Sequence, residues 1–276
     1  MKKQIKNAIN YIIKGIPEYK IETTIASFDN KDYLKNRVVL ITGGSKGIGL
    51  SIAKKIINAG GKVIITSRNQ DELNKVQKDL GKNCYAIKHD ISNVKDNDFI
   101  LTEATKRFGV IDSLINNAGI SLHENNFMDV TEESFDLNMN INLKGTYFMT
   151  QSFIKYYEKN NIKNGNIIIM CSETAGQPSY RPYGISKAAL ASFTKWLAQN
   201  YILKGIRINA IAPGVTETAM TNHYTKGKKV NHGAIGKRTL NTDEIAEICA
   251  FLLSDASNCI SGQIIACNEA NVCFEN

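Results

Sequence analysis

The sequence lacks the patterns by which structural metal sites and membrane spans are usually recognised. Its six cysteines include no pair separated by two residues, and none lies at zinc-ligand spacing from a histidine. Several lie in apolar runs, which favours buried free thiols in a reducing compartment over disulfides. No stretch approaches the ~18 apolar residues of a membrane span, and the basic start has no continuous apolar segment typical of signal peptides. We therefore expect a cytoplasmic protein with no transmembrane segment and no metal.

The chain also lacks an arginine-rich helix and a basic patch interleaved with aromatic residues, although its formal net charge is +8. A basic balance can indicate a nucleic-acid partner or an anionic membrane surface. Here the composition is rich in Lys, Asn and Ile, and the lysines are better explained as solvated surface residues. We expect no nucleic-acid partner, and we expect an anionic cofactor to use a few of these charges locally.

Internal repeats and low-complexity linkers are absent, so the sequence indicates one domain at 37–276 after an extension at 1–36. A chain of 276 residues with 43% hydrophobic residues can bury a full core. In the extension, apolar residues recur on one helical face: Ile5, Ala8, Ile9, Ile12 and Ile13. This spacing predicts an amphipathic helix. Packing on the body or on a neighbouring subunit is favoured over a membrane-surface role because the helix is short.

From Arg37 onward, short apolar runs typical of strands alternate with helical patterns. Strands are expected at 38–42, 62–66, 84–88, 112–116, 166–171, 206–211 and 263–267. Helices are expected near 47–59, 70–79, 96–108, 131–158, 182–203 and 242–254. This alternation predicts an α/β fold, a Rossmann-type doubly wound parallel sheet of about seven strands with helices on both faces. Ligands of such sheets bind beyond the C-terminal ends of the strands.

The first strand runs into a turn in which three glycines, Gly43, Gly47 and Gly49, precede a helical pattern. Such a turn brings backbone N–H groups and the positive end of a helix dipole to one point. That point suits a phosphate or pyrophosphate. The turn residues expected to contact a dinucleotide are Gly43, Ser45, Lys46, Gly47, Ile48 and Gly49.

The second strand is followed by Ser67 and Arg68, near the position where an acidic residue would hold the ribose 2′-hydroxyl of NAD. An acid is absent there, and the guanidinium of Arg68 offers a planar fork of donors for a 2′-phosphate. Lys46 adds a second positive charge. The sequence therefore favours NADP(H) over NAD(H).

Further cofactor contacts are expected after the third and fourth strands. Asp90 either accepts a hydrogen bond from the adenine amino group or caps the next turn through Ser92. Small residues after the fourth strand allow the backbone to approach a flat ligand. The residues expected to contribute here are Asp90, Ile91, Asn117, Ala118 and Gly119.

Tyr183 and Lys187 begin a helical pattern and share one face of it, because residues four apart on a helix are neighbours. A free tyrosine has a pKa of about 10, and nearby cations such as Lys187 and an oxidised nicotinamide lower it. A tyrosine tuned in this way exchanges a proton with a carbonyl oxygen near neutral pH. Ser172 follows a buried strand and can donate to the same oxygen.

With these motifs the chain resembles the short-chain dehydrogenase/reductase family, from about Leu34 to Asn268. The resemblance rests on Thr42–Gly49, Asn116–Gly119, Asn140–Leu143, Ser172, Tyr183 with Lys187, and Asn209–Gly214. It implies a reversible carbonyl reductase or alcohol dehydrogenase that uses NADP(H).

The resemblance also implies roles for individual residues. Tyr183 would be the general acid/base, and Lys187 would hold the nicotinamide ribose and tune Tyr183. Ser172 would position the carbonyl, and Asn142 would hold a water in a proton relay. The nicotinamide end would contact Pro213, Gly214, Val215, Thr216 and Thr218.

In pattern the chain is nearest to 3-oxoacyl-acyl carrier protein reductases, so an acyl carrier protein thioester is one expected substrate. A sugar or another small ketone is the alternative, and a nucleotide-sugar ketone, a steroid-like ketone or a polyol also stays open. A non-catalytic dinucleotide-binding regulator or scaffold is the alternative of another class, and the presence of Tyr183 and Lys187 disfavours it. Residues 216–240 are expected to form a mobile lid. The resemblance implies a homotetramer or homodimer built with the helices at 131–158 and 182–203.

Three features depart from the family pattern. The segment from Ser172 to Tyr183 is shorter than usual, and Ala175 takes a place where the family has glycine. The common Asp-Gly-Gly near the C-terminus is replaced by Asn268-Glu269-Ala270, which puts the usual C-terminal packing in question. The extension at 1–36 is longer than in the simplest members.

Overall fold

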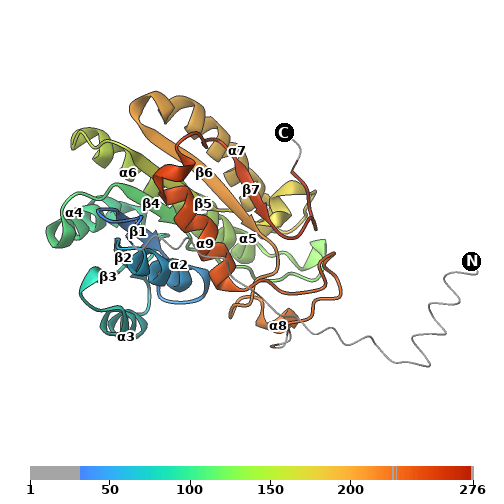
Figure 1. Cartoon of the computed structure of the whole chain (residues 1–276). Coiled ribbons are helices and arrows are strands. Elements are labelled where there is room, and N and C mark those ends of the chain that lie inside the picture. The colour runs from blue at the N-terminus through green and yellow to red at the C-terminus, as the bar shows by residue number, and fades with distance from the viewer. Residues whose placement is uncertain (1–31, 226, 228, 275–276) are drawn as a thin grey trace, which may run out of the picture.

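The computed structural model describes residues 32–225, 227 and 229–274. The amphipathic helix expected around residues 5–13 lies outside the described residues. The described part of the chain forms one α/β unit around a central sheet (Figure 1).

The predicted doubly wound sheet is confirmed: seven parallel strands lie in the order β3-β2-β1-β4-β5-β6-β7. The strands are β1 Val38–Thr42, β2 Lys62–Ser67, β3 Cys84–Lys88, β4 Ser113–Asn116, β5 Gly165–Met170, β6 Ile206–Pro213 and β7 Ile264–Cys267. The chain adds β2 and β3 on one side of β1 and then crosses to place β4 on its other side. The switch point between β1 and β4 is the position at which such folds bind ligands.

Helices cover both faces of this sheet (Figure 1). They are α2 Gly47–Asn58, α3 Gln70–Leu80, α4 Asn97–Phe108, α5 Glu132–Asn138, α6 Thr146–Lys159, α7 Pro182–Tyr201, the short α8 Asn222–Thr225, and α9 Thr242–Leu253. One core lies under α4, α6 and α7, and the other lies under α2, α3 and α9. Because both faces are covered, every residue of β1, β4, β5 and β6 is buried. This explains their nearly continuous apolar sequences.

The single helix expected at 131–158 is interrupted. Between α5 and α6, residues Met139–Gly145 form a π-helical segment. Its Asn142 side chain is fully buried and accepts from the Ile120 N–H at 2.8 Å while donating to the Ile120 carbonyl at 2.9 Å. Gly145 permits close packing here, because a Cβ would lie 2.8 Å from the Ile91 carbonyl oxygen. The widened turn thus brings a buried amide to the loop that follows β4.

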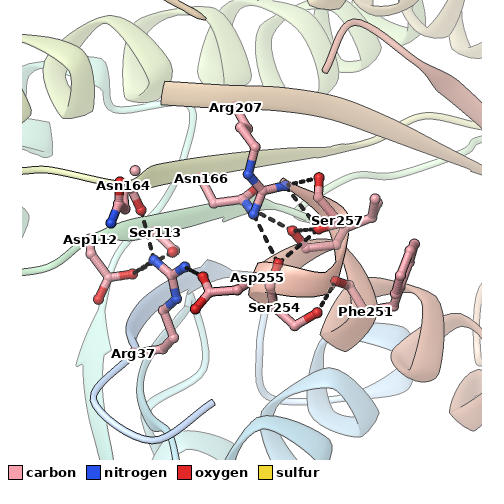
Figure 2. A network of polar contacts seen from close by, with 12 residues as sticks. Arg37, Asp112, Ser113, Asn164, Asn166, Arg207, Phe251, Ser254, Asp255 and Ser257 are labelled. Atoms are coloured by element: carbon pink, nitrogen blue, oxygen red, sulfur yellow. Dashed lines mark hydrogen bonds and ion pairs between the residues drawn. The ribbon is translucent and has the colours of Figure 1, made fainter. Parts of the chain in front are cut away.

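Two arginines form networks of polar contacts at the N-terminal ends of the strands (Figure 2). Arg37 forms ion pairs with Asp112 at 3.5 Å and Asp255 at 3.1 Å. Burial raises the pKa of the Asp112 carboxyl, although hydrogen bonds and the Arg37 charge act against it. The buried guanidinium of Arg207 donates to the carbonyl oxygen of Ser257 at 3.1 Å and to its hydroxyl at 2.9 Å. These contacts join the turn that follows α9 to the N-terminal ends of the strands. The switch-point turn lies at the opposite, C-terminal ends.

The C-terminal turn forms without the family's glycines. Glu269 and Ala270 both adopt left-handed backbone, with φ of 52° and 62°. Glycine adopts this conformation freely, whereas other residues are strained in it. The turn is held by an ion pair between Glu269 and Arg238 at 2.6 Å and by a hydrogen bond from the Asn268 amide to the Val272 carbonyl at 2.7 Å. Side-chain contacts therefore stabilise a turn that this sequence disfavours locally.

We predict that Ala270→Gly raises the free energy of unfolding by about 0.5 kcal/mol. Relief of about 1–2 kcal/mol of left-handed strain outweighs the entropic cost of about 0.5–1 kcal/mol for introducing glycine. Urea unfolding measures the change. As a control, Ala188→Gly in the exposed right-handed backbone of α7 is expected to lower stability by about 1 kcal/mol. A loss of stability in both variants would contradict the strain argument.

Candidate active site

A cleft of about 1320 Å³ opens along the C-terminal ends of the strands and spans the switch point. It is larger than the roughly 300–1,000 Å³ of a drug-sized pocket, which suits an extended ligand with a second molecule beside it. Apart from Gly49 and Asn142, every residue predicted for the site lines this cleft. The predicted lining residues are Gly43, Ser45, Lys46, Gly47, Ile48, Ser67, Arg68, Asp90, Ile91, Asn117, Ala118, Gly119, Ser172, Tyr183, Lys187, Pro213, Gly214, Val215, Thr216 and Thr218.

The glycine-rich turn is bound to the end of β4 by Asn117. The Asn117 side-chain amide donates to the carbonyl oxygens of Thr42 at 3.0 Å and Gly43 at 2.9 Å. In return, the Thr42 hydroxyl accepts from the backbone N–H groups of Asn117 at 3.0 Å and Ala118 at 3.1 Å. Gly43 has a φ of 68°, and a Cβ there would lie 2.9 Å from the Ala118 backbone. The floor of the cleft is therefore a rigid junction between β1 and β4.

Two glycines of this turn, Gly47 and Gly49, have different structural roles. Gly49 does not line the cleft. A Cβ there would lie 2.4 Å from the Gly43 carbonyl oxygen, so glycine lets α2 pack on the turn, and the expected cofactor contact of Gly49 stays a prediction. Gly47 has a φ of 55°, and a Cβ there would face the Thr218 methyl at 3.4 Å. The first turn of α2 contains no acidic residue, and no side chain caps it. Its N–H groups are thus suited to an anionic group in the cleft.

The adenosine end of the predicted site contains a carboxylate that the sequence analysis missed. The Ser45 hydroxyl lies 3.0 Å from the Ser67 hydroxyl and 2.9 Å from Glu72 Oε2. Lys46 Nζ lies 3.5 Å from Glu72 Oε1. Glu72 lies in the first turn of α3, and the sequence signal was the acid three residues after the helix cap at Asn69. One of the two cations expected to bind a 2′-phosphate is therefore already paired.

Asp90 lines the same cleft two residues after the end of β3, which pairs with the end of β2 at Ser67. Burial raises the pKa of the Asp90 carboxyl, but hydrogen bonds from Ser92 and the charge of Arg68 outweigh burial, so the pKa is lowered. Both the backbone N–H and the hydroxyl of Ser92 donate to Asp90 Oδ1, at 2.9 and 2.7 Å. Arg68 itself is exposed at the cleft mouth. Its guanidinium therefore acts on Asp90 through charge and is accessible to a ligand.

Tyr183 and Lys187 lie one turn apart at the start of α7, which begins with Pro182 at its first position. Lys187 Nζ is 5.5 Å from the centre of the Tyr183 ring and donates to the Met170 carbonyl at 2.7 Å. The Lys187 side chain is only 4% exposed, and burial lowers the pKa of its ammonium group. Because burial disfavours the charged form of this lysine, the ammonium group depends for its stabilisation on the Met170 carbonyl and on any polar ligand in the cleft.

Ser172 reaches the same cleft despite the shortened segment before Tyr183. It is buried after β5, and its hydroxyl accepts from the Thr174 N–H at 3.3 Å. This bond caps a 3₁₀ turn at Glu173–Gly176. The connection from β5 to α7 thus begins with a tight turn, and both Ser172 and Tyr183 line the cleft.

Asn142 lies behind the cleft wall. A Cβ at Gly119 would lie 3.1 Å from Asn142 Oδ1 and 3.6 Å from Lys187 Nζ, so the backbone at Gly119 adjoins both side chains. The Asn142 amide also donates to Asn138 Oδ1 at 3.3 Å. Its side-chain groups are therefore engaged by Ile120 and Asn138, and the expected water-binding role of Asn142 stays a prediction.

Several further cleft residues lie on loops and were not singled out from the sequence. His123 has a φ of 60°, and its ring nitrogen Nε2 lies 3.0 Å from the Met220 carbonyl oxygen, which links this loop to the segment expected as a lid. Arg181 donates to the Glu124 carbonyl at 2.9 Å. The additional polar lining residues include His89, Ser121, His123, Glu173, Gln177, Ser179, Tyr180, Arg181, Thr221 and Asn231. Their sequence signals were proximity to strand ends or to Ser172 and Tyr183, and, for Thr221 and Asn231, a place in the segment expected as a lid.

Among residues 32–225, 227 and 229–274, no group of three or more His, Cys, Asp or Glu is placed to hold a metal ion. No helix in the same described part of the chain is long and apolar enough to cross a membrane.

Residues 43–269 match a protein-family model described as enoyl-(acyl carrier protein) reductase. The chain is 30% identical over 246 residues to human dehydrogenase/reductase SDR family member 4, covering 85% of this chain and 87% of that protein. The crystal structure of a 3-ketoacyl-(acyl-carrier-protein) reductase from Brucella melitensis, complexed with NADH, is 31% identical with a TM-score of 0.81, covering 86% of this chain and 99% of that one.

A second Brucella melitensis structure, a short-chain dehydrogenase/reductase described as a glucose/ribitol dehydrogenase, is 27% identical with a TM-score of 0.80. It covers 88% of this chain and 100% of that one. The family model spans most of the chain, and the matched relatives are covered almost completely. The sheet order, the cleft and these similarities agree: the chain belongs to the short-chain dehydrogenase/reductase family of oxidoreductases.

Proposed function

We propose that this protein is a reversible NADP(H)-dependent oxidoreductase that interconverts a carbonyl compound and a secondary alcohol. The observation that carries the proposal is the position of Tyr183 and Lys187, one turn apart on the wall of a cleft whose other end is the glycine-rich turn. The NADH complex of the Brucella melitensis relative supports a nicotinamide dinucleotide as the cofactor.

The cleft residues fit such a cofactor. At Gly47 a side chain would project across the cleft toward Thr218, so the glycine leaves room there for a ligand. The uncapped first turn of α2 would hold the pyrophosphate, and Asn117 fixes the turn that leads into it. Lys187 and the segment from Pro213 to Thr218 would hold the nicotinamide end. When bound, the cofactor supplies or accepts the hydride.

The residues of the chain would handle the proton. In the reducing direction, the Tyr183 hydroxyl would donate a proton to the carbonyl oxygen, and it would recover one in the oxidising direction. Ser172 would donate a hydrogen bond that orients this oxygen. The Lys187 ammonium, buried beside the Tyr183 ring, favours the phenolate. Because the Asn142 amide is engaged, a relay water held by Asn142 would contact its backbone carbonyl.

A preference for NADP(H) would depend on Arg68. This exposed guanidinium at the cleft mouth can bind a 2′-phosphate with two parallel hydrogen bonds. Glu72 opposes the preference, because its carboxylate pairs with Lys46 and would repel the phosphate. We infer that the net preference reflects both residues, with Arg68 favouring the phosphate and Glu72 limiting its affinity.

The proposed assembly is a homotetramer or homodimer through α6 and α7. These helices expose large apolar side chains, at Tyr147, Phe148, Ile185 and Trp196. The Tyr147 ring stacks on Phe193 at 4.7 Å, which joins the two helices into one surface.

The cytoplasmic location is likewise a proposal, and the buried free thiols of Cys84, Cys171 and Cys249 support a reducing compartment.

We expect Tyr183→Phe to lower turnover by at least about 100-fold, because it removes the proton donor and leaves the ring. Nucleotide affinity, measured by fluorescence titration, should stay within about 3-fold of wild type, since the lost hydroxyl forms at most one neutral hydrogen bond. Retained turnover would remove Tyr183 from the proposed role.

Arg68→Ala should weaken NADPH binding by about 10- to 100-fold, the effect of one charge-assisted hydrogen-bonded contact, with little change for NADH. Glu72→Gln should strengthen NADPH binding by roughly 3- to 10-fold, because a repulsive charge is removed. Titration of each variant with both nucleotides gives the ratio of its NADPH affinity to its NADH affinity. Equal losses for NADPH and NADH in Arg68→Ala would show that Arg68 does not contact the 2′-phosphate.

Trp196→Glu should reduce the molar mass measured by light scattering, because a buried charge in an interface is strongly unfavourable. Trp196 is 55% exposed on α7. The matched control is Phe99→Glu on α4, where an aromatic side chain is 60% exposed outside the proposed interface. An unchanged mass for Trp196→Glu, or an equal fall for Phe99→Glu, would contradict the proposed interface.

A further inference from the structure

Glu173 is a buried carboxylate that the proposed proton-transfer mechanism does not use. It follows Ser172 directly, lines the cleft and is 8% exposed. A Cβ placed on Gly214 would lie 3.3 Å from Glu173 Oε2. The carboxylate therefore lies beside the Pro213–Gly214 segment at the proposed nicotinamide end, and its residue directly follows the serine that would orient the carbonyl.

The Glu173 carboxylate has few hydrogen-bond partners within the described part of the chain. Asn271 donates to Glu173 Oε2 at 3.0 Å. Within the described residues, no lysine or arginine forms an ion pair with Glu173. An ionised carboxylate accepts about four hydrogen bonds, and burial without them is costly. A ligand with donors beside its reacting carbon would satisfy the group, whereas a hydrocarbon chain would exclude water from it without compensation.

Other cleft residues add neutral donors and acceptors. Gln177 and Ser179 lie on the same connection between β5 and α7, and Thr221 and Asn231 face the cleft from the segment that follows β6. A hydroxylated ligand can form hydrogen bonds with such groups at several positions. An amine-bearing ligand would meet the positive charge of Arg181 on the same lining. Neutral hydroxyl groups therefore fit this cleft better than an ammonium group.

We propose that Glu173 determines substrate specificity by accepting hydrogen bonds from hydroxyl groups next to the reacting carbon. The substrate class is then a small hydroxylated ketone and the corresponding polyol, and not a 3-oxoacyl thioester. This inference rests on the proposed oxidoreductase function and adds the substrate class to it. Glu173 acts on the substrate by positioning it and takes no part in hydride or proton transfer.

A structural role for Glu173 is the competing explanation. Asn271 also accepts from the Ile235 N–H at 3.3 Å, so Glu173 and Asn271 could serve only to hold the C-terminal segment. Asn271→Ala separates the two roles, because it removes this contact and leaves the carboxylate in the cleft. A structural role predicts similar losses for every ketone in both variants.

The test compares erythrulose with butanone, two four-carbon ketones with and without hydroxyl groups, in the full-length protein with NADPH or NADH. An acetoacetyl thioester and aminoacetone complete the panel. The wild-type kcat/KM should be at least about 100-fold higher for erythrulose than for butanone or the thioester. Glu173→Gln should lower kcat/KM for erythrulose by about 10- to 100-fold and leave butanone within about 3-fold. Glu173→Leu should raise the value for butanone, and Asn271→Ala should keep the wild-type preference.

The outcomes separate the inference from the proposed function. Turnover of ketones with an unchanged erythrulose-to-butanone ratio in both Glu173 variants would overturn the inference and leave the oxidoreductase intact. A wild-type preference for the thioester or for aminoacetone would also overturn it. Nucleotide binding without turnover of any compound, in either direction, would overturn the proposed function and the inference with it.

Discussion

The binding end of the sheet depends on one side chain, the amide of Asn117. It joins the end of β4 to the turn after β1. Along the chain, Asn117 is 75 residues from Thr42 and 74 residues from Gly43. Without its two hydrogen bonds, the carbonyl oxygens of Thr42 and Gly43 would lose their donors at the switch point. Backbone groups that face away from the ligand must be satisfied by the protein so that others can face it. The rigid floor of the cleft follows from this constraint.

The two ends of the sheet are stabilised by different means, and this difference allows one end to bind ligands. At the N-terminal edge, Arg37 and Arg207 satisfy carbonyl and carboxylate groups within the protein. At the C-terminal edge, Lys187 and Glu173 are buried with few internal partners. Charged groups in this condition are costly in the absence of a ligand and are typical of functional sites. Two buried charged side chains with few partners among the described residues thus line the cleft.

Strand and helix positions could be predicted well from the sequence, because covered parallel strands such as Gly165–Met170 are continuously apolar. The glycine-rich turn and the four-residue spacing of Tyr183 and Lys187 were also readable, since both are local patterns. The π-helical segment at Met139–Gly145 was not, because its cause is a contact between Asn142 and Ile120. The task of Gly49 likewise depends on its neighbour Gly43 in space.

The sequence by itself determined the fold class, the order of the strands along the chain and the placement of Tyr183 and Lys187 on one helical turn. These depend on periodicity and short-range spacing, which the chain carries locally. Only the tertiary structure decided which charges meet. It placed Glu72 beside Lys46 and Ser45, and it brought Asn271 to Glu173 from 98 residues away. Contacts of this kind depend on how strands and loops converge at the switch point, and no local pattern encodes them.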